Sequence, residues 1–366
     1  MRKLATAATA FCAAIFAANY ILPLGRLTTI AVIAAVLGAA LAASRMPRLR
    51  QAALALVFLA LGLVYYSAYS ERTAAQAQFH SGETAVVGGH VLTYPINYGS
   101  YCRTEIKLDC EGLPKLKAIV YADEELMDAK PGDFIRFTGR LSAADTLFGE
   151  SYDNYHAKGI FFKISAKSAV SIENADFDLR SIPVKLSRLL SERVEKIFPA
   201  DTAVFMKSLM LGDKSDFYND DALYCTMSRA GFMHIVAVSG MHVSFLVGLL
   251  QFILGRGRRS AVICIALVWL FVLITGASPS AVRAGFMQSM LLMAPVLRRE
   301  NDAVTSLSAI LALILLSNPF AAASISLQLS FGAMAGIICF SGKLYDAAMN
   351  KLPKCMKRRT VRYVLA

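Results

Sequence analysis

The chain has 366 residues, 56% of them hydrophobic, and carries a formal net charge of +12. Its mean hydropathy is +0.50, and several apolar runs approach the ~20 residues that a membrane-spanning helix needs. These values exclude a soluble globular protein and predict a polytopic α-helical membrane protein.

Residues 1–70 predict three membrane spans. Apolar runs extend over residues 4–24, 27–43 and 52–69, and a turn with Pro23 and Gly25 joins the first two into a hairpin. The basic start and small residues of the first run also fit a cleavable signal peptide, but the run is longer than a typical signal-peptide core. We therefore interpret it as an uncleaved span.

Residues 71–180 have shorter apolar runs and many turn residues, and their alternation of apolar and polar side chains predicts a β domain. The expected strands are 84–93, 102–109, 117–122, 133–141 and 160–170, with a helical insert at 152–158 before the last strand. Twelve basic residues stand against sixteen acidic ones in this segment. A broad phosphate-binding surface is therefore not expected on it.

Cys102 and Cys110 are the two cysteines of this β domain. If the strand turns back between them, they can face each other and form a disulfide. Two unpaired thiols are the alternative, and the spacing does not choose between them.

Residues 181–222 place apolar side chains at helical spacing opposite Lys, Arg and Glu, and Pro199 interrupts the run. Amphipathic helices of this kind lie along a membrane surface. The alternative is a soluble linker helix that packs on the β domain. Membrane spans on both sides favour the interfacial location.

Residues 223–342 predict five further spans, near 234–254, 261–276, 281–297, 303–317 and 323–342, which makes about eight in the chain. Basic residues cluster in alternate connections, at 2–3, 45–50, 256–259 and 298–299, and again in the tail, residues 343–366. The positive-inside rule then places both termini in the cytoplasm and the β domain outside it. Topology, rather than nucleic-acid binding, thus explains the net positive charge.

The first span of this C-terminal group contains His234, Ser239, Gly240 and His242. In hydrocarbon, polar side chains must face a neighbouring helix or a water-filled cavity. A serine hydrolase is not favoured, because AVSGM lacks the first glycine of the G-x-S-x-G elbow and no acid lies nearby. Two histidines alone are also a weak signal for a metal. Helix packing through small residues and the lining of a pore remain open.

Arg283 lies one turn inside its span, just after Pro279. A buried cation needs a partner or water. The side chain either snorkels to the outer interface or faces a polar interior, with Gln288 and Gln328 as polar neighbours. We expect the polar residues of these spans to converge on one interior.

Four sequence blocks, in this order and spacing, resemble the competence domain of the ComEC family: LMLGDKS (209–215), AGFMHIVAVSGMHV (230–243), TGASPSAVRAGFM (275–287) and LQLSF (327–331). The resemblance implies an inner-membrane channel through which transformable bacteria take in single-stranded DNA. It makes Asp213 and Lys214 candidates for the outer mouth of the channel. The candidates for its lining are His234, Ser239, Gly240, His242, Arg283, Gln288 and Gln328.

The resemblance also implies an OB-like barrel in the β domain, because PGDFIRFTGRL and YDNYHAKGIFFKI match the family pattern. The sequence departs from that pattern at LFGES, where relatives usually have an Asn-Pro-Gly turn. OB-folds bind single strands on aromatic platforms. The candidate platform residues are Tyr94, Tyr98, Tyr101, Phe134 and Phe137, although aromatics in a small barrel more often belong to the core.

Family members usually continue into a metallo-β-lactamase-like domain, whereas this chain stops at Ala366 and has neither an H-x-H-x-D-H cluster nor a Walker A loop. We therefore expect no enzyme activity and no cofactor. We also expect that the chain is the product of a truncated gene, a fragment, or one half of a split channel. The expected partners are single-stranded DNA, the lipid bilayer, and a separately encoded nuclease or remaining channel half, with a homo-oligomer left open. A small-solute transporter, for which no inverted repeat is visible, and an inactive or structural membrane protein remain the alternatives.

Overall fold

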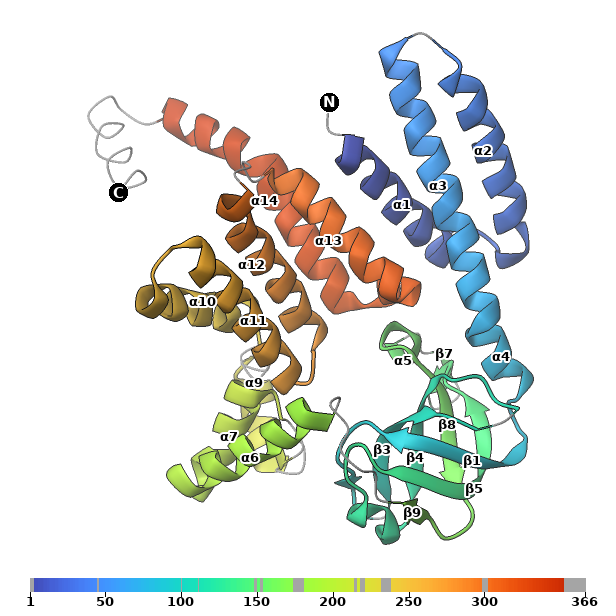
Figure 1. Ribbon diagram of the computed structural model, residues 1–366, viewed down its shortest axis with the longest axis vertical. Coiled ribbons are helices and arrows are strands. Elements are labelled where there is room, and N and C mark those ends of the chain that lie inside the picture. Colours follow the sequence, from blue (N-terminus) through green and yellow to red (C-terminus); the bar gives the residue numbers. More distant parts are fainter. Residues whose placement is uncertain are drawn as a thin grey trace.

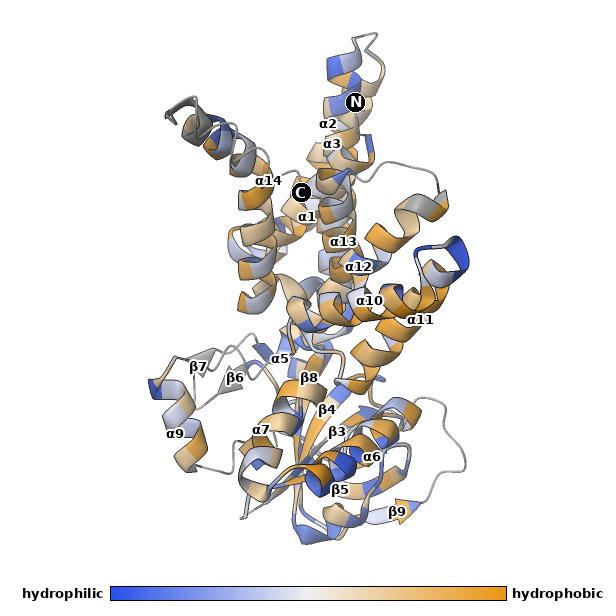
Figure 2. Cartoon of the chain, turned by 90° about the vertical axis from the view of Figure 1, so that its left-hand side faces the viewer, coloured by the Kyte–Doolittle hydropathy of each residue, from blue (hydrophilic) through white to orange (hydrophobic). Residues whose placement is uncertain are grey.

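The structure is a computed structural model that describes residues 3–44, 46–99, 101–110, 112–147, 150–151, 154–173, 181–213, 216–217, 221–231, 238–297 and 302–351. The N-terminal helices and the last helices of the chain lie at one end of the molecule, and a β barrel lies at the other end, below the N-terminal helices (Figure 1). Hydrophobic residues predominate along the helix Arg258–Ile274, labelled α11, and hydrophilic residues are common on the barrel (Figure 2).

The N-terminal part contains four helices. They are α1 Lys3–Tyr20, α2 Leu27–Ala42, α3 Pro47–Arg72 and α4 Ala74–Phe79, with a 3-10 turn η1 Leu24–Arg26 between α1 and α2. Pro47 occupies the first turn of α3, where its fixed φ suits a helix and its missing N–H is not needed. A Cβ at Gly62 would lie 2.8 Å from the carbonyl oxygen of Phe11, so glycine is what lets α3 approach α1 this closely.

The predicted strands are confirmed, and they close into a five-stranded barrel. The strands are β1 Thr84–Val91, β3 Cys102–Leu108, β4 Lys117–Ala122, β5 Phe134–Ala143 and β8 Ile160–Ala166. β1 pairs with both β3 and β5, β3 pairs with β4, and β8 lies parallel to β4 and antiparallel to β5. Alternate residues such as Ile106, Val120, Ile135 and Ile164 point inward and are fully buried.

Shorter elements complete the barrel. They are β2 Ile96–Asn97, η2 Glu124–Asp128, β6 Thr146–Leu147, β7 Glu150–Ser151, α5 Asn154–Ala157 and β9 Ser171–Glu173. β2 extends the edge at β3, β9 pairs with β5, and β6 pairs with β7 in a separate two-stranded sheet. The expected helical insert is present as α5.

The elements after the barrel are α6 Ile182–Ile197, α7 Ala200–Leu211, α9 Asp221–Arg229, α10 Gly240–Leu254, α11 Arg258–Ile274, α12 Pro279–Leu297, α13 Ala303–Ser317, η5 Pro319–Ala323 and α14 Ile325–Lys351. Of the two amphipathic helices expected before the C-terminal group, α6 is amphipathic, whereas α7 is an apolar helix without a distinct polar face. Helix α13 packs against α1, which joins the C-terminal helices to the N-terminal ones. Helix α6 reaches the barrel, where the Arg188 guanidinium lies 4.5 Å from the centre of the Tyr94 ring.

The expectation of eight membrane spans is not confirmed. Three described helices are long and apolar enough to cross a bilayer: Leu24–Ala42, Pro47–Phe79 and Ile325–Ala347. Helices α10 and α13 have 15 residues each, which at ~1.5 Å per residue is shorter than a hydrocarbon core of ~30 Å. The apolar runs of the sequence therefore predicted the positions of the helices more accurately than their lengths.

The disulfide between Cys102 and Cys110 is not formed, and both are free cysteines. Cys102 begins β3, and Cys110 follows the end of the same strand. The extended segment from Cys102 to Leu108 spans ~20 Å, whereas the Cα atoms of a disulfide lie less than ~7 Å apart. The strand does not turn back between them, so the geometry excludes this bridge.

Candidate functional site

Ser239 and His242 form the N-terminal cap of α10. The backbone N–H of Ser239 donates to Nδ1 of His242 over 3.0 Å, and the Ser239 side chain accepts from the backbone N–H of His242. Because Nδ1 accepts a backbone hydrogen bond, it carries no proton. This reciprocal pair is a capping box that satisfies two otherwise unpaired donors of a helix N-terminus.

A seam of small and polar residues joins α10 to α12. Ser280 Oγ donates to the Val238 carbonyl over 2.7 Å, and Gln288 Nε2 donates to Ser244 Oγ over 2.8 Å. Between these bonds, a Cβ added at Gly240 would meet the Cβ of Ala284 at 3.7 Å. Residues four apart lie on one helix face, so this stripe of α12 faces α10 along its length.

Arg283 lies on a different face of α12 and points toward α14. It is 6% exposed, and its nearest polar partner is Ser326 Oγ, 3.5 Å from a terminal guanidinium nitrogen. Its Nε is buried without a hydrogen-bond partner, and no acidic side chain forms an ion pair with it in the part of the chain that the structure describes. This burial disfavours a side chain that snorkels to water.

Gln328 forms a third set of polar contacts, separate from those of the α10–α12 seam and of Arg283. Its Nε2 donates to the Tyr20 hydroxyl over 2.5 Å and to the Ala322 carbonyl over 2.8 Å, which links α14 to α1 and η5. The polar residues therefore do not share one contact, because the capping pair and Gln288 lie at the α10–α12 seam whereas Arg283 and Gln328 bond elsewhere.

A buried lysine of α7 forms an ion-pair cluster with two half-exposed carboxylates, which the sequence interpretation missed. Lys207 is 5% exposed, and its Nζ bonds to Glu195 over 2.5 Å and also to Asp216. Burial by itself lowers the pKa of Lys207, but the bonds to Asp216 and Glu195 outweigh it, so the pKa is raised. The contribution of Lys207 to stability is therefore fully present below a pH of ~10.4 as long as the two carboxylates are ionised, and it is lost as the pH rises through the raised pKa. A lysine inside the apolar run VFMKSLML was the available signal.

Asp213 lies just outside this cluster. Ser191 Oγ donates to its carboxylate over 3.4 Å, and the preceding Gly212 ends α7 with a φ of +74°, in the left-handed region that favours glycine. Lys214 and His234 lie outside the described residues.

Three of the four sequence blocks meet at one place, the motif junction, defined here by Gly212, Val238, Thr275 and Ser280. A Cβ at Gly212 would lie 3.2 Å from the Thr275 carbonyl oxygen and 3.3 Å from a Val238 methyl, and Ser280 bonds to Val238. Arg283 extends this contact to Ser326, which directly precedes the fourth block. The chain thus folds so that separate motifs build one continuous structure.

The sequence model of the family described as competence protein matches residues 209–365. The ComE operon protein 3 of Bacillus subtilis (strain 168) is 25% identical to the chain over 229 residues, which are 60% of this chain and 29% of that protein. The chain therefore spans less than a third of the length of that relative. No solved structure matches the chain.

Proposed function

We propose that this chain is a member of the ComEC-type competence family with a role in DNA uptake, and that it forms part of a channel for single-stranded DNA in the bacterial inner membrane. The match of residues 209–365 to the competence-protein model and the similarity to the ComE operon protein 3 support this proposal. The motif junction and the α12–α14 contact line the path in this proposal. His234 belongs to the lining, Asp213 and Lys214 lie at the outer mouth, and both termini face the cytoplasm. A separately encoded nuclease or remaining channel half and further copies of the chain are the proposed partners.

The observation that carries the proposal is the buried guanidinium of Arg283. A cation enclosed without a counter-charge is destabilising unless water or an anion reaches it. A DNA strand supplies one phosphate charge per nucleotide, and arginine binds phosphate through its planar set of donors. We assign to Arg283 the role of meeting these phosphates, with Ser326 orienting the side chain.

The barrel offers a second contact for the strand. Its strand order and the parallel pair β4 and β8 support the OB-like assignment. Tyr98 and Tyr101 are each 41% exposed, and their rings stack at 5.3 Å, whereas Phe137 belongs to the core at 3%. We assign to the two tyrosines, rather than to Phe137, the stacking of bases.

Uptake of labelled DNA in a deletion strain tests the proposal. Loss of uptake on deletion is expected for a DNA channel and is not expected for a small-solute transporter or a structural protein. Arg283→Ala should reduce uptake strongly, and Arg283→Lys should keep the charge but only part of the activity. Arg193→Ala, at an exposed position of α6, is the matched control. Unchanged uptake in both Arg283 variants, with normal protein levels in the membrane, would contradict the assignment.

A further inference from the structure

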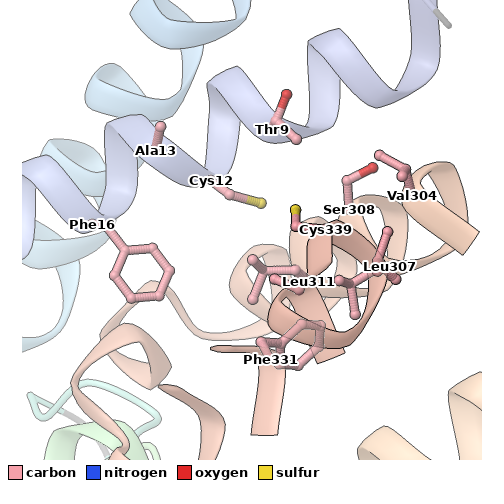
Figure 3. Close-up of a pocket in the computed structure, with 12 residues that line it drawn as sticks. Thr9, Cys12, Ala13, Phe16, Val304, Leu307, Ser308, Leu311, Phe331 and Cys339 are labelled. Atoms are coloured by element: carbon pink, nitrogen blue, oxygen red, sulfur yellow. The ribbon is translucent and has the colours of Figure 1, made fainter. Parts of the chain in front are cut away.

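An apolar groove lies between α1, α13 and α14, away from the motif junction. Its volume is about 420 Å³. Figure 3 shows Thr9, Cys12 and Phe16 of α1 on one side, and Leu311 and Phe331 on the other. Thr9, Ala13, Ala335 and Cys339 are exposed residues of its lining, so the groove opens at the surface of the helical part.

The lining of the groove follows the helices. On α1 it extends from Thr9 to Phe16, and on α14 from Phe331 to Cys339. At 1.5 Å per residue these stretches are ~10 Å and ~12 Å long. A groove lined over these lengths can hold part of an extended hydrocarbon chain.

The lining offers no free polar group to water. The hydroxyl of Thr9 donates to the Ala5 carbonyl over 2.7 Å, and the hydroxyl of Ser308 donates to the Thr305 carbonyl over 3.1 Å. An ordered water needs two to four polar partners, and an unfilled space beside apolar side chains forfeits their dispersion contacts. An apolar occupant is therefore favoured over water.

The surroundings of the groove indicate where the occupant comes from. Helix α14 contains one of the three candidate membrane spans, and only 11% of that span is buried inside the protein. If this span crosses the bilayer, the groove beside it faces the lipid. Near one end, Lys343 follows Cys339 by one helical turn and Lys3 starts α1; both are exposed, and neither forms an ion pair among the described residues.

We propose that this groove is a lipid site that holds one acyl chain of an anionic phospholipid, with its phosphate near Lys3 and Lys343. The two unpaired cations complement the negative headgroup, and the apolar lining matches the chain. The site would fix α14 against α1 and α13 by filling the space between them. The proposal depends on the membrane setting of α14 and does not depend on DNA passage.

Photo-crosslinking tests the acyl-chain part. The full chain is reconstituted in vesicles of phosphatidylglycerol and phosphatidylethanolamine that contain a phospholipid with a diazirine on its acyl chain, and the labelled peptides are mapped by mass spectrometry. Labelling should concentrate on residues 9–16, 304–311 and 331–339. Ala13→Trp and Ala335→Trp fill the groove and should lower this labelling severalfold. Ala35→Trp, at an exposed position of α2, should not.

A second measurement tests the part of the proposal that concerns the anionic headgroup. Lys3→Gln and Lys343→Gln should each lower the preference for phosphatidylglycerol over phosphatidylethanolamine by about fivefold, while total labelling in the groove stays. An unchanged preference would overturn the anionic headgroup. Labelling spread evenly over all exposed helices, or a crosslink through Cys339 between two copies of the chain in place of lipid labelling, would overturn the site.

Discussion

The polar residues of the C-terminal helices differ in how well the structure satisfies them. His242 has a backbone donor on Nδ1, Gln288 bonds to Ser244, and Gln328 bonds to Tyr20. Arg283 instead has only a 3.5 Å contact to Ser326 and a buried Nε without a partner. A polar group whose hydrogen bonds are made within the protein needs no ligand, so Arg283 is the residue for which we infer an external anion.

The capping pair gives a residue-scale prediction that separates structure from chemistry. His242→Gln keeps an acceptor at the third helical position and should preserve the cap of α10. His242→Ala removes it and should lower the stability of the protein by ~1 kcal/mol, measured as thermal unfolding in detergent. We expect DNA uptake to survive His242→Gln.

Ser239→Ala is the control for this prediction, because it removes the other half of the same box. Its loss of stability and that of His242→Ala should not add in the double variant, since the two side chains act on one helix end. If His242→Gln abolished uptake at unchanged stability, the imidazole would have a chemical role that a cap does not explain.

At the scale of elements, the most specific contact is the docking of the barrel onto the helices. Asn318 Nδ2 donates to the carbonyls of His156 and Ala157 over 2.8 and 3.1 Å, and Phe320 packs against Phe161 with ring centres 6.0 Å apart. The turn η5 between α13 and α14 thus holds α5 of the barrel. Because α14 continues from this turn, the position of the barrel is coupled to the helix that contacts Arg283.

Asn318→Ala should loosen this docking without unfolding either part. The change removes the side-chain donor of the Ala157 carbonyl, whereas the His156 carbonyl keeps the backbone N–H of Gly159, and an unsatisfied buried carbonyl costs ~2 kcal/mol. Hydrogen–deuterium exchange should rise at residues 154–157 and 319–323. Asn97→Ala, whose side chain accepts from Gly99 within its own turn, should leave these segments unchanged. Equal exchange in both variants would show that the aromatic contacts alone hold the barrel.

The sequence predicted the elements that depend on local pattern. Strands β3 and β5 alternate between buried and more exposed residues along most of their length, so their positions followed from the residues alone. The docking by Asn318 was not predictable, because its partners lie about 160 residues away in the chain. The sequence left the Cys102–Cys110 disulfide open for a similar reason: whether the two cysteines approach depends on the path of β3, which pairing with β4 keeps straight, so that both are free.

The candidate site was predicted only in part. The polar residues were recognised by the unfavourable free energy of placing them in hydrocarbon, which does not reveal the neighbour that satisfies each one. The contact of Gly212 with Thr275 and Val238 depends on the packing of three helices. The buried Lys207 was overlooked because lysine in an amphipathic helix usually faces water.

At the scale of the whole molecule, charge and shape indicate one orientation in the membrane. The helices α2 and α3 belong to two candidate spans that form a hairpin, and the basic segment 45–50 lies at its turn. The barrel follows the opposite end of α3 (Figure 1). If the two helices cross the bilayer, the barrel and the basic turn are on opposite sides, and the positive-inside rule places the turn in the cytoplasm.

Reporter fusions test this orientation. A reporter fused after Arg180 should report the outside, and one fused after Arg259 should report the cytoplasm, because the basic cluster 256–259 resists translocation. Replacing Arg45, Arg48 and Arg50 with Gln weakens the signal that holds the first hairpin turn inside, so a fraction of the protein should invert, whereas Arg136→Gln on the barrel should have no effect. Both fusions reporting the same side would mean that the chain crosses the bilayer an even number of times between residues 180 and 259, so that α10 would not be a membrane span.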